Sequence, residues 1–136
     1  MVAGEINRML SGDPGYDMVV ATRDHHVDPG EHFSDSPDFK DSWPPHCVAG
    51  TSGAQQHPGL TFAEWDAVFL KGRDAAAYSG FEGTDERTGE LLGDYLREHG
   101  VTEVDVCGIA ADYCVDATAR DAAAAGFGTT VLTDLT

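Results

Sequence analysis

The stretch EVDVCGIAADYCVDATARDAAAAG, residues 103–126, predicts a strand followed directly by a helix. Its first part, EVDVCGIA, is a short apolar run typical of a buried strand. The alanine-rich part that follows has Asp112 as its expected N-cap and Gly126 as its expected C′ residue. We therefore expect Cys114 to lie in the first turn of this helix, directly after a strand.

The same alternation of strands and helices continues on both sides of this stretch. Apolar runs predict further strands over 17–22, 66–72 and 129–134. Helical spacing predicts helices over 5–10 and 88–100, and the second places four apolar side chains on one face: Leu91, Leu92, Tyr95 and Leu96. Because none of the strands shows a polar face, the pattern favours a three-layer α/β/α domain with a parallel sheet, in which ligands bind at the carboxyl ends of the strands.

Composition excludes several classes of partner. Acidic residues outnumber basic ones 24 to 8, and the formal net charge of −16 disfavours nucleic acid and anionic membranes. No apolar window approaches the roughly 18 to 20 residues that span a bilayer, and the start does not resemble a signal peptide, so we expect a cytoplasmic protein. The three cysteines indicate thiols rather than a disulfide framework. Whether the chain forms homo-oligomers is left open.

A long stretch without periodicity, residues 23–60, is interpreted as a functional loop inserted into a single domain that spans residues 1–136. Four of the six histidines lie within residues 25–46, and three of them, with one carboxylate, suggest a site for Zn²⁺, Fe²⁺ or Mn²⁺: Asp24, His26, His32 and His46. Asp24 and His26 are two residues apart, so in extended backbone they point to the same side. The alternative is a set of solvated loop histidines.

Two further side chains are expected at the same edge of the sheet. Cys114 lies near a helix N-terminus, where the backbone amides favour a thiolate and hence a nucleophile. Lys71 ends the strand over 66–72 and could neutralise a carboxylate or a developing oxyanion. The alternatives are a small buried thiol and a lysine that only reaches water. Cys107 is expected in the core, and Cys47 is either a ligand or a packed thiol.

Five segments resemble the nicotinamidase/pyrazinamidase branch of the isochorismatase-like cysteine hydrolases: TRDHHVDPGEHFS (22–34), SWPPHC (42–47), VFLKG (68–72), AYSGFEG (77–83) and VDVCGIAADYCV (104–115). The resemblance implies a parallel sheet and one divalent metal ion held by the aspartate and three histidines named above. It also implies that Cys114 is the nucleophile and Lys71 the active-site lysine.

The resemblance assigns further roles around the nucleophile. It implies a cis peptide between Ile109 and Ala110, and an oxyanion hole formed by the amides of Ala110 and Cys114. Three aromatic residues are expected to bind the substrate ring: Trp43, Tyr78 and Tyr113, the last at a position where relatives often have histidine. Asp112 matches an acidic residue that supports the site.

The activity that the resemblance implies is hydrolysis of nicotinamide, and of pyrazinamide as a further substrate, to a carboxylate and ammonia in NAD salvage. Two alternatives stay open. One is a different amidase of the superfamily acting on a carbamoyl or ureido compound, and the other is a truncated metal-binding chain without turnover. The four metal ligands and SWPPHC favour nicotinamide hydrolysis over a carbamoyl or ureido substrate.

The family also has a first strand with a catalytic aspartate and a closing helix with a last strand, and no residue of this chain matches them. We expect the first strand of the family to lie between the strands over 17–22 and 103–110. We therefore expect this chain to be part of a longer product, or a truncated form that folds poorly alone, because unpaired buried backbone groups cost about 1 to 3 kcal/mol each.

Overall fold

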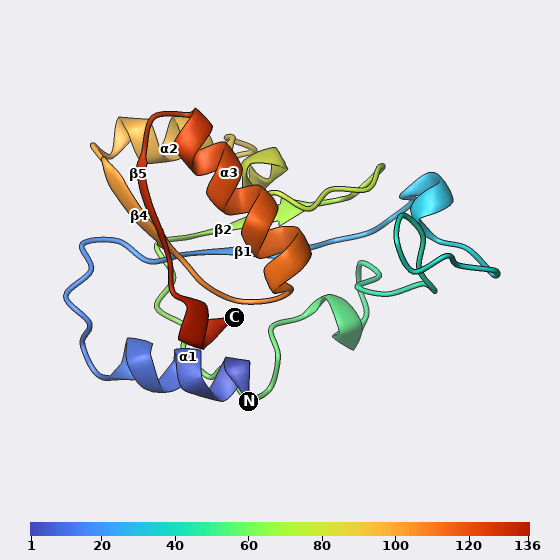
Figure 1. The fold of residues 1–136 in the computed structure, drawn as a ribbon, viewed down its shortest axis with the longest axis horizontal. Helices are drawn as coiled ribbons and strands as arrows, with labels where there is room; N and C mark the ends of the chain where they lie inside the picture. The colour runs from blue at the N-terminus through green and yellow to red at the C-terminus, as the bar shows by residue number, and fades with distance from the viewer.

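The computed structural model describes all of residues 1–136 (Figure 1). It has three α-helices: α1 (Val2–Ser11), α2 (Leu92–Glu98) and α3 (Asp116–Ala124). It has five strands: β1 (Val20–Asp24), β2 (Ala67–Lys71), β3 (Thr84–Asp85), β4 (Glu103–Val106) and β5 (Gly128–Val131). In the view of Figure 1, most of α2 and α3 lies above β1 and β2, α1 lies below these two strands, and β4 and β5 run beside α2 and α3. The α/β class predicted from the sequence is confirmed.

The strands form two sheets rather than one. The first has the order β1-β2-β3, with β1 parallel and β3 antiparallel to β2, and the second pairs β4 with β5 in parallel. No backbone hydrogen bond joins β1 to β4. The two-residue β3 was not predicted, because it is too short to leave a pattern in the sequence. The extra strand expected between β1 and β4 stays a prediction.

The first strand begins later than its apolar run suggests. Residues 17–22 were predicted, whereas β1 runs from Val20 to Asp24. The amide of Val19 donates to the Asp66 carboxylate over 2.7 Å, and the Asp66 amide donates to the Val19 carbonyl. These contacts take the place of regular strand pairing at Val19, so β1 begins at Val20. Its last residue is Asp24, which places that carboxylate at the strand end.

The hydrophobic core lies between β2 and α2. Its centre is Phe69, which is fully buried, and the other members are Ala67, Leu92, Leu96 and Phe127. Tyr95 packs against this cluster as expected, but Leu91 is 47% exposed. Leu91 was placed on the buried face because the helix was predicted to begin at residue 88, whereas α2 begins at Leu92.

The helix predicted over 112–126 is divided into two parts. Ala111–Val115 forms a π-helical turn, in which the Ala110 carbonyl accepts from both Tyr113 and Val115, and α3 begins only at Asp116. Asp112 therefore makes no N-cap hydrogen bond, contrary to expectation. The C-terminal end is as predicted, since Gly126 has a φ of 95° directly after the helix.

Residues 25–66, between β1 and β2, contain no strand or α-helix and include a lobe that projects from the carboxyl end of β1 (Figure 1). Two isolated bridges close it on itself, one between His26 and Val48 and one between Phe33 and Trp43. The irregular loop was predicted over 23–60, whereas the irregular segment begins after Asp24, because residues 23 and 24 belong to β1. Backbone hydrogen bonds within the segment provide its order. None of the helices is long and apolar enough to cross a membrane.

Candidate active site

The centre of the candidate site is Lys71, which lies at the carboxyl end of β2 and is 4% exposed. The parallel register pairs it with Asp24 at the end of β1. Its Nζ donates to the Asp24 carboxylate, to the Ala77 carbonyl over 3.1 Å and to the Cys114 Sγ over 3.5 Å. The convergence of three strand ends that the sequence predicted is therefore present around one buried ammonium group.

Three histidines gather beside this group. The ring centroids of His26, His32 and His46 lie 5.0–5.1 Å apart, and one ring nitrogen of each lies within 4.8 Å of the others. His26 and His32 are buried and His46 is partly buried. The alternative of separate, solvated loop histidines does not describe this arrangement, because ordinary surface histidines face water rather than one another.

Hydrogen bonds orient two of the three rings. The Nδ1 of His26 lies 2.6 Å from the Gly72 carbonyl and the Nδ1 of His46 lies 2.9 Å from the Pro44 carbonyl. A carbonyl can only accept, so the neutral form of each ring has its proton on Nδ1 and its lone pair on Nε2. Gly72 is required at its position, because it has a φ of 75° and a Cβ there would lie 2.5 Å from the His26 ring.

The free nitrogen atoms fit a bound cation. The Nε2 atoms of His32 and His46 lie 3.3 Å apart, and the buried Nε2 of His26 has no hydrogen-bond partner. Burial, followed by the neighbouring His26 and His46, lowers the pKa of His32, which favours its neutral form. Neutral imidazoles with one nitrogen fixed by a carbonyl are the usual ligands of Zn²⁺ and similar ions, so this donor set fits the predicted metal.

Asp24, the fourth ligand expected from the sequence, is shared between two neighbours. One carboxylate oxygen accepts from Lys71, and the other lies 3.9 Å from the Nε2 of His26. It is therefore adjacent to the histidine cluster without being one of the three grouped donors. As a metal ligand it stays a prediction.

Cys114 lies in the π-helical turn that follows β4, where its thiol faces Lys71. The peptide between Ile109 and Ala110 is cis, as the resemblance implied. The exposed Ala110 amide donates no hydrogen bond within the chain, so it is available to an oxyanion. Asp112 is exposed on the same turn and makes no side-chain hydrogen bond.

The three expected substrate-binding aromatic residues form one row with His32. Ring centroids lie 6.1 Å apart for His32 and Tyr78, 5.4 Å for Tyr78 and Tyr113, and 5.6 Å for Tyr113 and Trp43. The first and last pairs are edge-to-face, the arrangement that aromatic rings prefer. The row gives a flat ring a wall that begins at the histidine cluster.

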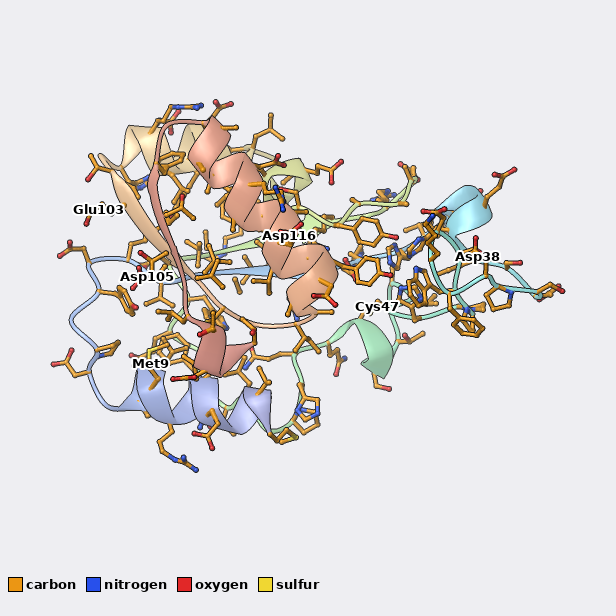
Figure 2. The ribbon with its side chains drawn as sticks, viewed as in Figure 1. Met9, Asp38, Cys47, Glu103, Asp105 and Asp116 are labelled. Carbon is orange, nitrogen blue, oxygen red and sulfur yellow. The ribbon has the colours of Figure 1, made fainter.

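The other two thiols lie outside this arrangement. Cys107 follows the last residue of β4, is only partly buried and is not a member of the core cluster, so the core position expected for it is wrong. Its partial burial raises the pKa of its thiol. Burial and then the Asp24 carboxylate raise the pKa of Cys47, and the thiol is not among the grouped metal donors. Figure 2 shows Cys47 between the lobe and the body of the molecule. The packed-thiol reading of Cys47 fits better than the ligand reading.

Two side chains that were not predicted from the sequence hold the loop that follows Tyr78. The Ser79 hydroxyl accepts from the Phe81 amide over 3.1 Å, and the Thr118 hydroxyl on α3 accepts from the Gly80 amide over 2.8 Å. Thr118 lies four residues after Cys114, so it joins the loop of Tyr78 to the helical segment that carries Cys114. Nothing in a single sequence marks this contact.

Comparisons with known proteins agree with the geometry. The family model "Isochorismatase domain" matches residues 6–136. The chain is 54% identical to the nicotinamidase/pyrazinamidase of Mycobacterium tuberculosis over 99% of its own length and 72% of that relative. Among solved structures, PnC1 from L. infantum in complex with nicotinate has a TM-score of 0.81 at 37% identity, covering 99% of this chain and 67% of that one.

A second solved structure is similar, the pyrazinamidase of Pyrococcus horikoshii in complex with zinc. Its TM-score is 0.79 at 34% identity, over 98% of this chain and 70% of that one. The family model covers almost the whole chain, and the identity to the M. tuberculosis relative extends from end to end. The chain therefore belongs to the isochorismatase family, in its nicotinamidase/pyrazinamidase branch.

Proposed function

We propose that this protein is a cysteine amidase that hydrolyses nicotinamide to nicotinate and ammonia, with pyrazinamide as a further substrate. The observation that carries the proposal is the contact of the Lys71 Nζ with the Cys114 Sγ, beside a cluster of three histidines and a row of aromatic rings. A flat heteroaromatic amide needs these three parts: a nucleophile for its carbonyl, a wall for its ring and a ligand for its ring nitrogen.

Cys114 would act as the nucleophile. Lys71 places a positive charge beside the sulfur and so favours the thiolate. The thiolate attacks the amide carbonyl, the carbonyl π electrons move to the oxygen, and the Ala110 and Cys114 amides stabilise that oxyanion. Collapse of the tetrahedral intermediate breaks the C–N bond, and the nitrogen leaves as ammonia with the proton released by the thiol. Water then cleaves the thioester, which gives the carboxylate and restores the thiol.

His26, His32 and His46, with Asp24 beside them, would hold one divalent ion. When bound, the ion supplies a Lewis acid that accepts the lone pair of the pyridine nitrogen. The chain's own residues do the rest: Tyr78, Tyr113 and Trp43 contact the ring and exclude water from it. We include zinc as the first ion to test, because the P. horikoshii relative is described in complex with zinc.

The names of the relatives support the same substrate class. The M. tuberculosis relative is a nicotinamidase/pyrazinamidase, and the L. infantum relative is in complex with nicotinate, the product of the proposed reaction. A nicotinamidase returns nicotinate to the synthesis of pyridine nucleotides, so we place the protein in NAD salvage.

The test is ammonia release from nicotinamide by the zinc-loaded chain and by its Cys114→Ala variant, with Cys107→Ala as the matched control. We expect turnover in the first and in the control, and a loss of at least about a thousandfold for Cys114→Ala, because the covalent route is removed. Metal content should be the same in all three, since neither cysteine is a grouped metal donor.

A second arm repeats the assay on a protein extended upstream in the gene, where the family's catalytic aspartate is expected. Turnover by the extended protein alone would support the proposed chemistry and assign the missing proton transfer to the upstream residues. Metal uptake by both proteins without turnover of nicotinamide by either would contradict the proposal and favour an inert metal-binding chain.

A further inference from the structure

The lobe contains a turn, residues 38–42, that is organised around a single carboxylate oxygen. The Oδ1 of Asp38 accepts the amides of Lys40, Asp41 and Ser42 over 2.9–3.0 Å and the Ser42 hydroxyl over 3.1 Å. These backbone hydrogen bonds hold the pKa of the Asp38 carboxyl well below its usual range. The Asp38 amide in turn donates to the Ser42 Oγ over 3.0 Å. Both the backbone and the side chain of Asp38 are therefore hydrogen-bonded to Ser42, which closes the turn.

The closed turn fixes Phe39 in an unusual position. Phe39 has a φ of 58° and its side chain is 60% exposed, a combination that costs free energy in both backbone and solvation. Its amide donates to the Ser42 carbonyl over 3.0 Å. Such a conformation persists only where surrounding bonds impose it, and here those bonds are the ones that converge on Asp38.

Phe39 forms the outer end of the aromatic row. Its ring lies edge-on to Trp43 with centroids 5.9 Å apart, and Trp43 contacts Tyr113 on its other side at 5.6 Å. Figure 2 shows Asp38 in the projecting lobe, away from the body of the molecule. The Trp43 indole is therefore placed between one ring from the body and one ring from the turn.

The backbone of Trp43 is held separately from its ring. The Trp43 amide donates to the His32 carbonyl over 2.8 Å, and the Ser34 amide donates to the Trp43 carbonyl over 2.9 Å. This clasp lies between the turn and the histidine cluster. A change in the turn should therefore move the Trp43 ring without moving the histidines.

We propose that Asp38 is a positioning residue for the substrate: through Phe39 it sets the orientation of the Trp43 ring that contacts the bound heteroaromatic ring. This inference rests on the proposed function, since it assumes that the Trp43 ring contacts the substrate. Asp38 acts through its Oδ1 as a hydrogen-bond acceptor rather than through its charge. An asparagine, which keeps that oxygen, should therefore replace it, whereas an alanine should not.

The experiment compares four variants in the full chain: Asp38→Ala, Asp38→Asn, Phe39→Ala and Asp41→Ala. Asp41 is the matched control, because it is an exposed aspartate of the same turn whose carboxylate accepts no hydrogen bond. All four are made in a Trp65→Phe background, in which Trp43 is the only fluorophore of its kind. The measurements are steady-state kinetics with nicotinamide, nicotinate quenching of Trp43 fluorescence, acrylamide quenching of the same signal, and zinc content.

We expect Asp38→Ala and Phe39→Ala to raise KM and the Kd of nicotinate by about tenfold, with kcat changed by less than about threefold, since one fixed ring contact is lost. Acrylamide should quench Trp43 more strongly in both. Asp38→Asn and Asp41→Ala should stay within about twofold of the parent in every measurement. Zinc content should not change, because the clasp between His32 and Trp43 remains.

Three results would overturn the inference. They are an Asp38→Ala variant with unchanged KM and quenching, an Asp38→Asn variant as impaired as Asp38→Ala, and a loss of zinc that accompanies the rise in KM, which would show general support of the lobe. If neither the parent chain nor the protein extended upstream turns over nicotinamide or binds nicotinate, the proposed function fails. Acrylamide quenching still shows in that case whether Asp38 holds the Trp43 ring.

Discussion

The two sheets of the molecule carry different parts of the site and differ in how deeply their strands are buried. In β2, alternate residues Ala67, Phe69 and Lys71 are all buried, whereas no residue of β4 or β5 is buried. Lys71 thus lies on a strand with one fully buried face, whereas Cys114 follows a sheet whose residues are only partly buried or exposed. Burial fixes one half of the site, and a few cross-contacts must fix the other.

Those cross-contacts can be named. Lys71 reaches Cys114 over 3.5 Å, the Thr118 hydroxyl accepts from Gly80, and Tyr16, before β1, donates to Asp105 on β4. Each joins a group near the first sheet to the second sheet or its helix. The difference between the sheets therefore predicts that mutations within β2 mainly lower the stability of the fold. Mutations of the cross-contacts should mainly change the position of Cys114.

The largest expected effect is a difference in the free energy of unfolding between truncations on β2 and on β4. Phe69→Ala should lower the free energy of unfolding by about 3 to 5 kcal/mol, because the ring is fully buried against α2. Val104→Ala on β4 should cost only about 1 kcal/mol, because Val104 is partly buried. Urea unfolding followed by circular dichroism measures both. Equal losses would show that β4 is as well packed in solution as β2.

Replacing Lys71, which joins the two halves of the site, should lower stability less than Phe69→Ala does but should reduce activity more. Lys71→Met keeps the length of the side chain and removes its charge, which leaves Asp24 without its cation. Because the Asp24 side chain is 22% exposed and can take up water, we expect a loss of about 1 to 3 kcal/mol, below the usual cost of breaking a buried pair.

Ammonia release by Lys71→Met should fall by at least about a hundredfold, since the charge beside the sulfur is gone. Lys40→Met is the matched control, because Lys40 is the other lysine of the chain and is exposed in the lobe. Its stability and activity should stay near those of the parent. A Lys71→Met variant with parent activity would contradict the role assigned to the contact with Cys114.

Much of this arrangement could be predicted from the sequence, because it follows from strand ends. Asp24, Lys71 and Cys114 were expected at one edge since each comes directly after an apolar run, and parallel strands bring such positions together. His26, His32 and His46 were grouped because their segment has stiff, irregular backbone. Burial in β2 and the positive φ of Gly126 also agreed with the sequence pattern.

What the sequence did not predict depends on contacts between distant residues or on local backbone geometry. The π-helical turn before α3 looks like an ordinary helix start, so the assigned N-cap at Asp112 was wrong. The positive φ values of Phe39 and Cys47 leave no composition signal, since neither residue is a glycine. The turn closed by Asp38 and Ser42 was not predicted, because it depends on which side chain accepts the backbone amides of residues 40–42.

The smallest expected effect on stability comes from the contact between the loop before β1 and strand β4. It tests most directly whether this contact joins the two sheets. The Tyr16 hydroxyl donates to the Asp105 carboxylate over 2.5 Å. This hydrogen bond, followed by partial burial, raises the pKa of Tyr16 to about 12. The folded state therefore keeps the phenol protonated at a pH where the unfolded chain, with a pKa of about 10, loses the proton.

Because the folded-state pKa is raised, the stabilisation from Tyr16 is fully present below about pH 10 and is lost as the pH rises towards 12. Tyr16 is 41% exposed, so Tyr16→Phe should cost less than about 1 kcal/mol at pH 8, and the difference from the parent should close between pH 10 and 12. The measurement is urea unfolding of both proteins at pH 8, 10 and 12. The comparison uses the difference between them because the pKa of Tyr95 is also raised, mainly by burial, and contributes equally to both. Curves that stay parallel through this range would mean that the bond between Tyr16 and Asp105 does not join the two halves in solution.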